Sequence, residues 1–68
     1  MTHAETLFAG CVNGAVMART NARNDRRLAR EWPNCAEEYE RDARKAFQRA
    51  RDYLRWARSF RSEINANG

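Results

Sequence analysis

Few residues in this sequence break a helix. One proline, Pro33, and three glycines among 68 residues exclude a fold built from many tight turns. Proline disfavours a helical backbone at the residue before it and lacks an N–H group of its own. We therefore expect the chain to turn at Trp32-Pro33-Asn34 and to form long helices on either side.

Cysteine and histidine are also rare. Cys11 and Cys35 do not make a disulfide framework, and with the single histidine, His3, they do not complete a zinc site. The sequence has no nucleophile beside a histidine base, no glycine-rich phosphate loop and no metal-binding helix signature. We predict a protein that is not an enzyme, with no cofactor, no metal ion and no small-molecule substrate.

Long apolar runs are missing as well. The most apolar stretch, Leu7 to Ala18, contains the polar residue Asn13 and is too short to span a bilayer. No basic segment precedes it, and Glu5 lies where a signal peptide would carry a lysine. We expect a cytoplasmic chain without a membrane segment.

The charged residues are dominated by arginine. Lysine and arginine number 13 against 9 aspartate and glutamate, which gives a formal net charge of +4, and 43% of the residues are hydrophobic. This composition is typical of a folded helical protein and not of a disordered one. A core in a chain below roughly 70–80 residues supplies only a few kcal/mol, so we expect self-association.

The strongest pattern in the sequence is a heptad seam in its second half. Apolar residues alternate by three and four positions, and alanine recurs at every seventh position. They are Ala36, Tyr39, Ala43, Ala46, Ala50, Tyr53, Ala57, Phe60 and Ile64. Alanine lets a facing helix come close. The seam predicts a helix over about 35–64, capped through Asn34 and Glu37.

A matching seam runs through the first half of the chain. Thr2 and Glu5 have capping-box spacing, so a helix should begin near His3. The seam positions are Ala4, Phe8, Cys11, Ala15, Ala18, Ala22, Asp25, Ala29 and Trp32. The polar run that ends at Asp25 leaves open a break into two shorter helices. Because the period continues in phase across it, we predict one helix over about 3–31.

The two seams fit each other when the chain folds back about Asn34. Positions whose residue numbers add to 68 then lie level, and bulky residues mostly face small ones, as a packed core requires. The predicted fold class is all-α. We expect a single domain over 1–68 that forms an antiparallel two-helix hairpin, with the turn at 32–34 and a fraying end over 65–68.

Residues beside the seams give an independent check on this alignment. Opposite charges should face each other across the helices in two pairs, Glu5 with Arg61 and Arg26 with Glu40. Trp56 should lie level with Gly14, where the missing side chain leaves room for an indole. Each exposed ion pair contributes only about 0–1 kcal/mol, so these charges select the register and do not hold the fold together.

Apolar residues outside the seams fall on two flanks, and such patches usually mark interfaces. An alanine seam buries little area, so we predict that one flank pairs with its two-fold copy to form a four-helix bundle. The residues predicted for this dimer interface are Val12, Val16, Phe47 and Leu54. On the other flank, the residues predicted to bind a protein partner are Met17, Leu28, Arg49 and Trp56. The reverse assignment of the two flanks stays open.

Arginines on the outer surface of the second helix support a different interpretation, because a basic stripe can follow phosphates. The candidates for nucleic-acid binding are Arg44, Arg51, Arg55 and Arg58. Acidic residues interrupt the stripe, no outward aromatic side chain lies between the arginines, and no DNA-reading motif is present. Nucleic-acid binding is therefore the alternative to protein binding.

The start Met1-Thr2-x-x-Glu5, the bend at Trp32-Pro33-Asn34 and the small residues of both seams resemble the plasmid repressor-of-primer hairpin. That family forms homodimeric four-helix bundles that bind paired RNA loops. The resemblance implies the same architecture. The family's RNA-contacting residues have no clear match in this sequence, so none is assigned.

In its size, arginine content and paired-helix pattern over Ala36 to Ile64, the chain is also similar to small phage-encoded proteins that disarm host factors. Among these are anti-activators that block transcription regulators. This resemblance implies stoichiometric binding to a larger host protein. We therefore expect a homodimeric inhibitor that occludes a host regulatory protein, with repressor-of-primer-like RNA binding or other basic nucleic-acid binding as the alternative.

Overall fold

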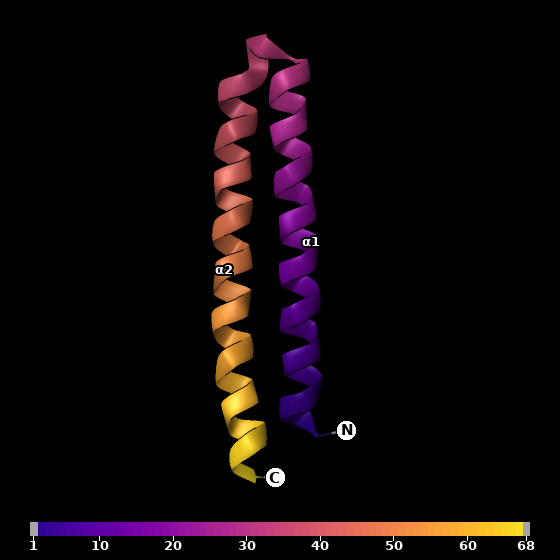
Figure 1. The fold of residues 1–68 in the computed structure, drawn as a ribbon, viewed down its shortest axis with the longest axis vertical. Coiled ribbons are helices and arrows are strands. Elements are labelled where there is room, and N and C mark those ends of the chain that lie inside the picture. The colour runs from indigo at the N-terminus through magenta and orange to yellow at the C-terminus, as the bar shows by residue number, and fades with distance from the viewer. Residues whose placement is uncertain (1, 68) are drawn as a thin grey trace.

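Two long antiparallel helices joined by a tight turn make up the fold (Figure 1). The computed structural model describes residues 2–67. Helix α1 covers His3–Glu31, the 3-10 turn η1 covers Pro33–Cys35, and helix α2 covers Ala36–Asn67. The hairpin measures 52 × 16 × 11 Å. The predicted all-α hairpin is confirmed.

Helix α1 begins with the predicted threonine cap. Thr2 has an extended backbone, and its Oγ1 accepts a hydrogen bond from the backbone N–H of Glu5 at 3.2 Å. Inside the helix, the Thr20 hydroxyl donates to the Val16 carbonyl at 3.0 Å, which satisfies a polar side chain without breaking the helix. The chain therefore continues as one helix through the polar run and does not split into two.

The turn lies one residue later than the predicted 32–34. Trp32 leaves the helical backbone, its N–H donates to the Leu28 carbonyl at 2.8 Å, and its carbonyl accepts from the Cys35 N–H at 2.9 Å. Because the 3-10 turn leads directly into α2, Asn34 lies inside the turn. Within residues 2–67 its side chain makes no hydrogen bond to the first turn of α2, so the predicted asparagine cap was wrong.

Helix α2 is longer than predicted. It continues to Asn67 and does not end near Ile64. Neither proline nor glycine occurs in the three residues after Ile64, so no backbone restriction stops the helix there. Gly68, the last residue of the predicted fraying end, lies outside the described residues.

The core is a stripe of alanine between the two helices. The buried residues of the described chain are all alanines at predicted seam positions: Ala15, Ala18, Ala22, Ala29, Ala43, Ala46, Ala50 and Ala57. The aromatic seam residues Phe8, Tyr53 and Phe60 are half-buried. Trp32 is 59% exposed, since the chain turns there and carries the indole away from the seam.

Contacts between the helices agree with the predicted register. The pairs in contact are Gly14 with Tyr53, Arg26 with Phe47, and Arg61 with Phe8. The residue numbers of Gly14 and Tyr53 add to 67 and those of Arg61 and Phe8 to 69, close to the 68 that the alignment of the seams requires. Those of Arg26 and Phe47 add to 73, so this contact is made diagonally by the long arginine side chain.

The space above Gly14 is occupied by Tyr53 and not, as predicted, by Trp56. A Cβ atom at residue 14 would lie 2.9 Å from the Tyr53 ring. Trp56 packs edge-on against Tyr53, with ring centroids 5.6 Å apart and an interplanar angle of 86°. The reason is positional: Tyr53 belongs to the seam and faces α1, whereas Trp56 lies on the flank.

Gly10 and Gly14 form a matched pair for testing this close approach. We expect Gly10→Ala to raise the free energy of unfolding by about 0.5–1 kcal/mol, because alanine favours helix and nothing lies within 4 Å of the added Cβ. Gly14→Ala gains the same propensity but must displace the Tyr53 ring, so it should stabilise less or destabilise. Thermal unfolding at one protein concentration measures the difference. Equal melting temperatures for the two variants would contradict the contact.

The alanine seam itself is tested by enlarging one buried position. Ala22 is 0% exposed, so Ala22→Leu should force the helices apart and lower the free energy of unfolding by about 1–3 kcal/mol. In a domain of this size each kcal/mol corresponds to roughly 4–8 °C in melting temperature. The control is Ala9→Leu, which changes an exposed residue of the same helix. A loss of similar size in the control would show that the seam is not the sensitive position.

Candidate interaction surfaces

The first half of α1 is apolar around its whole circumference. Over residues Leu7–Ala18, here named the apolar half of α1, Asn13 is the one strongly polar side chain. Helix α2 covers one side of this segment. On the other sides Val16 is 58% exposed and Met17 is 67% exposed. A helix that is hydrophobic all round is normally buried on all sides, so this surface lacks part of its cover.

The residues predicted for a dimer interface are only partly exposed. Val12 and Phe47 are half-buried, whereas Val16 is 58% and Leu54 is 39% exposed. Phe47 lies beneath the Arg26 guanidinium, whose central carbon is 4.6 Å from the ring centroid. Val16 and Leu54 are therefore the exposed apolar members of this set.

The residues predicted to bind a protein partner are spread along the other flank. Met17 and Trp56 are 67% and 52% exposed. Leu28 is half-buried and lies about 16 Å from Met17 along α1, at roughly 1.5 Å per residue. Arg49 lines a separate hollow with Asp42. Met17 and Trp56 are the members of this set with exposed apolar surface.

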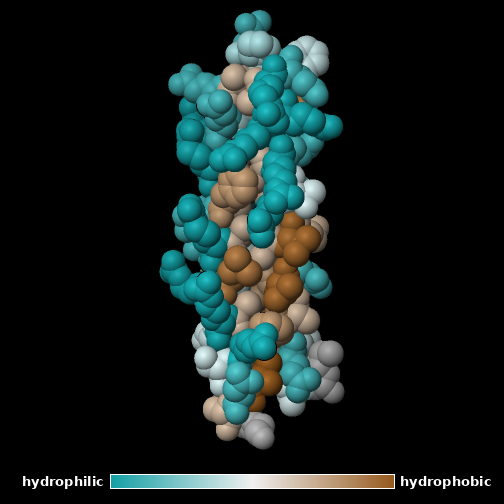
Figure 2. Space-filling view, in the orientation of Figure 1, coloured by the Kyte–Doolittle hydropathy of each residue, from teal (hydrophilic) through white to brown (hydrophobic). Residues whose placement is uncertain are grey.

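Two adjoining hollows between the helices are lined by arginine. They share Arg26 and Arg44, so they form one groove that runs from near η1 towards Leu54. It is named here the arginine groove, and its arginines are Arg19, Arg23, Arg26, Arg30, Arg44 and Arg51. Its other lining residues include Ala43, Phe47 and Ala50. Figure 2 shows one face of the hairpin, with hydrophilic groups dominating the half near the turn and hydrophobic groups gathered in the other half.

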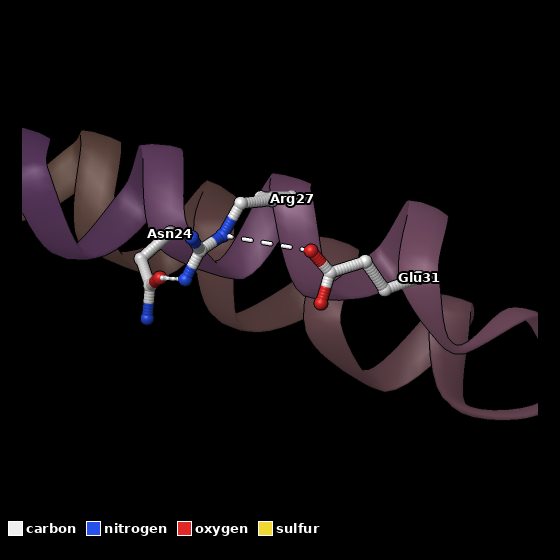
Figure 3. A network of polar contacts seen from close by, with 3 residues as sticks. All are labelled: Asn24, Arg27 and Glu31. Atoms are coloured by element: carbon white, nitrogen blue, oxygen red, sulfur yellow. Dashed lines mark hydrogen bonds and ion pairs between the residues drawn. The ribbon is translucent and has the colours of Figure 1, made fainter.

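The charge of the arginine groove is largely uncompensated. Its lining contains one carboxylate, Glu40. Within residues 2–67 the ion pair that forms lies outside the groove, between Arg27 and Glu31 at 4.0 Å (Figure 3). Arg27 also donates a hydrogen bond to Asn24 at 2.6 Å. Because both charged side chains are more than half exposed, this pair contributes little to stability.

The two predicted cross-helix ion pairs are not formed. Arg26 lies over the Phe47 ring and does not pair with Glu40, and Arg61 does not pair with Glu5. A guanidinium over an aromatic ring gains about 0.5–1 kcal/mol at an exposed site, which equals or exceeds a typical exposed ion pair. The predicted charge pairing was therefore wrong. The register is supported instead by the contacts of Arg61 with Phe8 and of Gly14 with Tyr53.

The predicted nucleic-acid set is divided by the groove. Arg44 and Arg51 line it, whereas Arg55 and Arg58 do not. Arg19 and Arg26 were missed from the sequence as members of the same site, because the candidates were all arginines of the second helix and Arg26 was matched with Glu40. Their spacing of seven residues, parallel to that of Arg44 and Arg51, was the signal that could have identified them.

The described chain was also compared with the requirements of thiol, metal and membrane sites. Cys11 is half-buried and Cys35 is exposed, and both are free thiols. Over residues 2–67 no three side chains of histidine, cysteine, aspartate or glutamate gather in a way that could hold a metal ion. No helix in that range has an apolar stretch long enough to cross a membrane.

Comparisons with known proteins do not assign a family. No family model, no curated protein and no solved structure matches this chain. Its function has to be argued from the surfaces described above.

Proposed function

We propose that the hairpin is a non-enzymatic interaction module that acts as a homodimer and occludes a cytoplasmic host regulatory protein. The observation that carries this proposal is the apolar half of α1, which α2 covers on one side only. Exposed apolar surface of this extent usually marks a protein interface. The resemblance to small phage-encoded inhibitors supports occlusion as the mode of action.

The exposed area of the hairpin supports self-association. It exposes 5413 Å², whereas a compact monomer of 7.9 kDa exposes about 4400 Å². The excess of about 1000 Å² is comparable to the roughly 800 Å² that each partner buries in an interface of standard size. Two hairpins that pair through this area form a four-helix bundle.

The alanine core supports the same proposal. Each buried methylene-sized group contributes only about 0.8 kcal/mol, and the buried residues of the described chain are all alanines. Larger apolar side chains are half-buried or exposed instead. Burying Val12 and Val16 against a second copy adds hydrophobic stabilisation that the isolated hairpin lacks.

The distribution of charge favours one arrangement of the two copies. A parallel pair would place the two arginine grooves side by side, where like charges repel. With the turns at opposite ends, the apolar halves of α1 overlap and the arginine-rich ends separate. A two-fold axis near Val16 generates this contact from identical surfaces.

The flank that carries Met17 and Trp56 is then left for the target protein. Tryptophan is a frequent energetic hot spot at interfaces. The edge-on contact with Tyr53 already orients the Trp56 ring, so little side-chain freedom is lost on binding. A target held at this flank is blocked sterically by the rest of the dimer.

The dimer is tested by placing a charge in its proposed centre. We expect the natural chain to sediment as a dimer at micromolar concentration and Val16→Glu to sediment as a folded monomer, because the carboxylate cannot be buried unpaired. Ser62→Glu adds the same charge on the exposed side of α2 and should leave the dimer intact. A folded monomer for the natural chain would refute the proposed dimer.

The target-binding flank is tested with the two exposed tryptophans. Trp56 and Trp32 are 52% and 59% exposed, so Trp56→Ala and Trp32→Ala remove similar surface. In a pull-down from nuclease-treated lysate of host cells, we expect Trp56→Ala to reduce capture of the bound protein by about tenfold or more, as for a hot spot, and Trp32→Ala to retain it.

Two results of the same pull-down would count against this assignment. Loss of all bound material on nuclease treatment would favour the nucleic-acid alternative. Equal capture by the natural chain and Trp56→Ala would remove this flank from the interface.

A further inference from the structure

The arginine groove concentrates positive charge that no neighbouring group neutralises. Within residues 2–67 none of its six arginines forms an ion pair with a carboxylate. A groove lined by charges of one sign attracts ligands of the opposite sign. A ligand that binds in the arginine groove should therefore carry several negative charges.

Apolar residues also line the groove, and they narrow the class of ligand that fits it. Ala43 and Ala50 line the groove but are only 2% and 3% exposed, and Phe47 is half-buried. Leu54, which is 39% exposed, is the most exposed apolar residue of the lining. A phosphate backbone has no apolar surface to bury against these side chains. The Phe47 ring is also covered by Arg26, so it does not offer the open face on which bases stack. The ligand should therefore also carry an apolar stripe between its negative charges.

The spacing of the arginines matches the repeat of a packed helix. The groove arginines form pairs seven residues apart: Arg19 with Arg26, Arg23 with Arg30, and Arg44 with Arg51. Seven residues correspond to two helical turns, or about 10.5 Å. A third helix lying between two others presents its flanking positions at this same heptad interval. Acidic residues on both sides of an apolar heptad stripe would therefore meet both rows of arginines.

We infer that the arginine groove is a docking site for an amphipathic helix of a partner protein, with an apolar heptad stripe flanked by aspartate or glutamate. Recognition is of the helix-in-groove kind. The groove extends about 16 Å along α1 from Arg19 to Arg30, which corresponds to roughly three turns of the bound helix. This inference rests on the proposed function only in taking the partner to be a protein.

The probe for this site is a fluorescein-labelled peptide of roughly three heptads, with leucine at the core positions and glutamate at the flanking positions. A scrambled peptide of identical composition removes the heptad stripe and keeps the charge. We expect the heptad peptide to bind the natural chain, to become helical on binding, and to bind about tenfold more tightly than the scrambled peptide. Fluorescence anisotropy measures affinity, and circular dichroism measures the gain in helix.

Two matched variants locate the binding site. The groove variant combines Arg19→Gln, Arg26→Gln, Arg44→Gln and Arg51→Gln, and the control combines Arg27→Gln, Arg41→Gln, Arg55→Gln and Arg58→Gln. Both lower the net charge by the same amount, and no residue of the control lines the groove. We expect the groove variant to lose about tenfold in affinity through its four ion pairs and the control to remain within about twofold. Circular dichroism of each free variant verifies that the hairpin is folded.

Several outcomes would overturn the inference. They are absence of peptide binding, equal binding of the scrambled peptide, and equal loss in the two variants. Tighter binding of single-stranded polyuridylate than of the peptide, lost selectively in the groove variant, would identify a nucleic-acid site instead. The monomeric Val16→Glu variant separates this inference from the proposed dimer, because it should bind the heptad peptide as well as the natural chain does.

Discussion

The close contact of two alanine-lined helices is the constraint on which the rest of the structure depends. Because the buried side chains of the described residues are all alanines, the helices can approach closely, and no large residue fits between them at mid-length. Aromatic seam residues such as Phe8 and Phe60 are half-buried instead. The same constraint leaves valine, methionine and tryptophan on the outside, where they are available for contacts with other molecules.

The heptad that forms the core also organises the surface. Residues beside the seam recur every seven positions, so the arginines of α1 and α2 fall into two rows along one groove, and the apolar side chains gather in the other half of the hairpin (Figure 2). Because of this separation, the arginine groove and the apolar half of α1 suit partners of different chemistry. The separation also disfavours pairing of two copies through their arginine-rich ends, since like charges would meet.

The core and its register could be predicted from the sequence because a heptad period is a local property that survives unchanged into the packed pair. Side-chain partners outside the seam could not. Arg26 can contact either Glu40 or Phe47. The two contacts have such similar free energies that matching the two seams does not show which one forms. The contact at Gly14 was within reach of the sequence, because Tyr53 is a seam residue that faces α1 whereas Trp56 lies on the flank. The arginine groove was missed since its members come from both helices.

The intrachain register of the two seams is tested most directly by nuclear Overhauser contacts between side chains of α1 and α2. Samples that mix isotope-labelled and unlabelled chains distinguish contacts within one chain from contacts between chains. We expect contacts within one chain between the methyl groups of Ala18 and Ala50 and between the rings of Phe8 and Phe60. If these contacts arise only between chains, or if Ala18 and Ala50 each contact other positions, the alanine seam does not join the two helices of one hairpin.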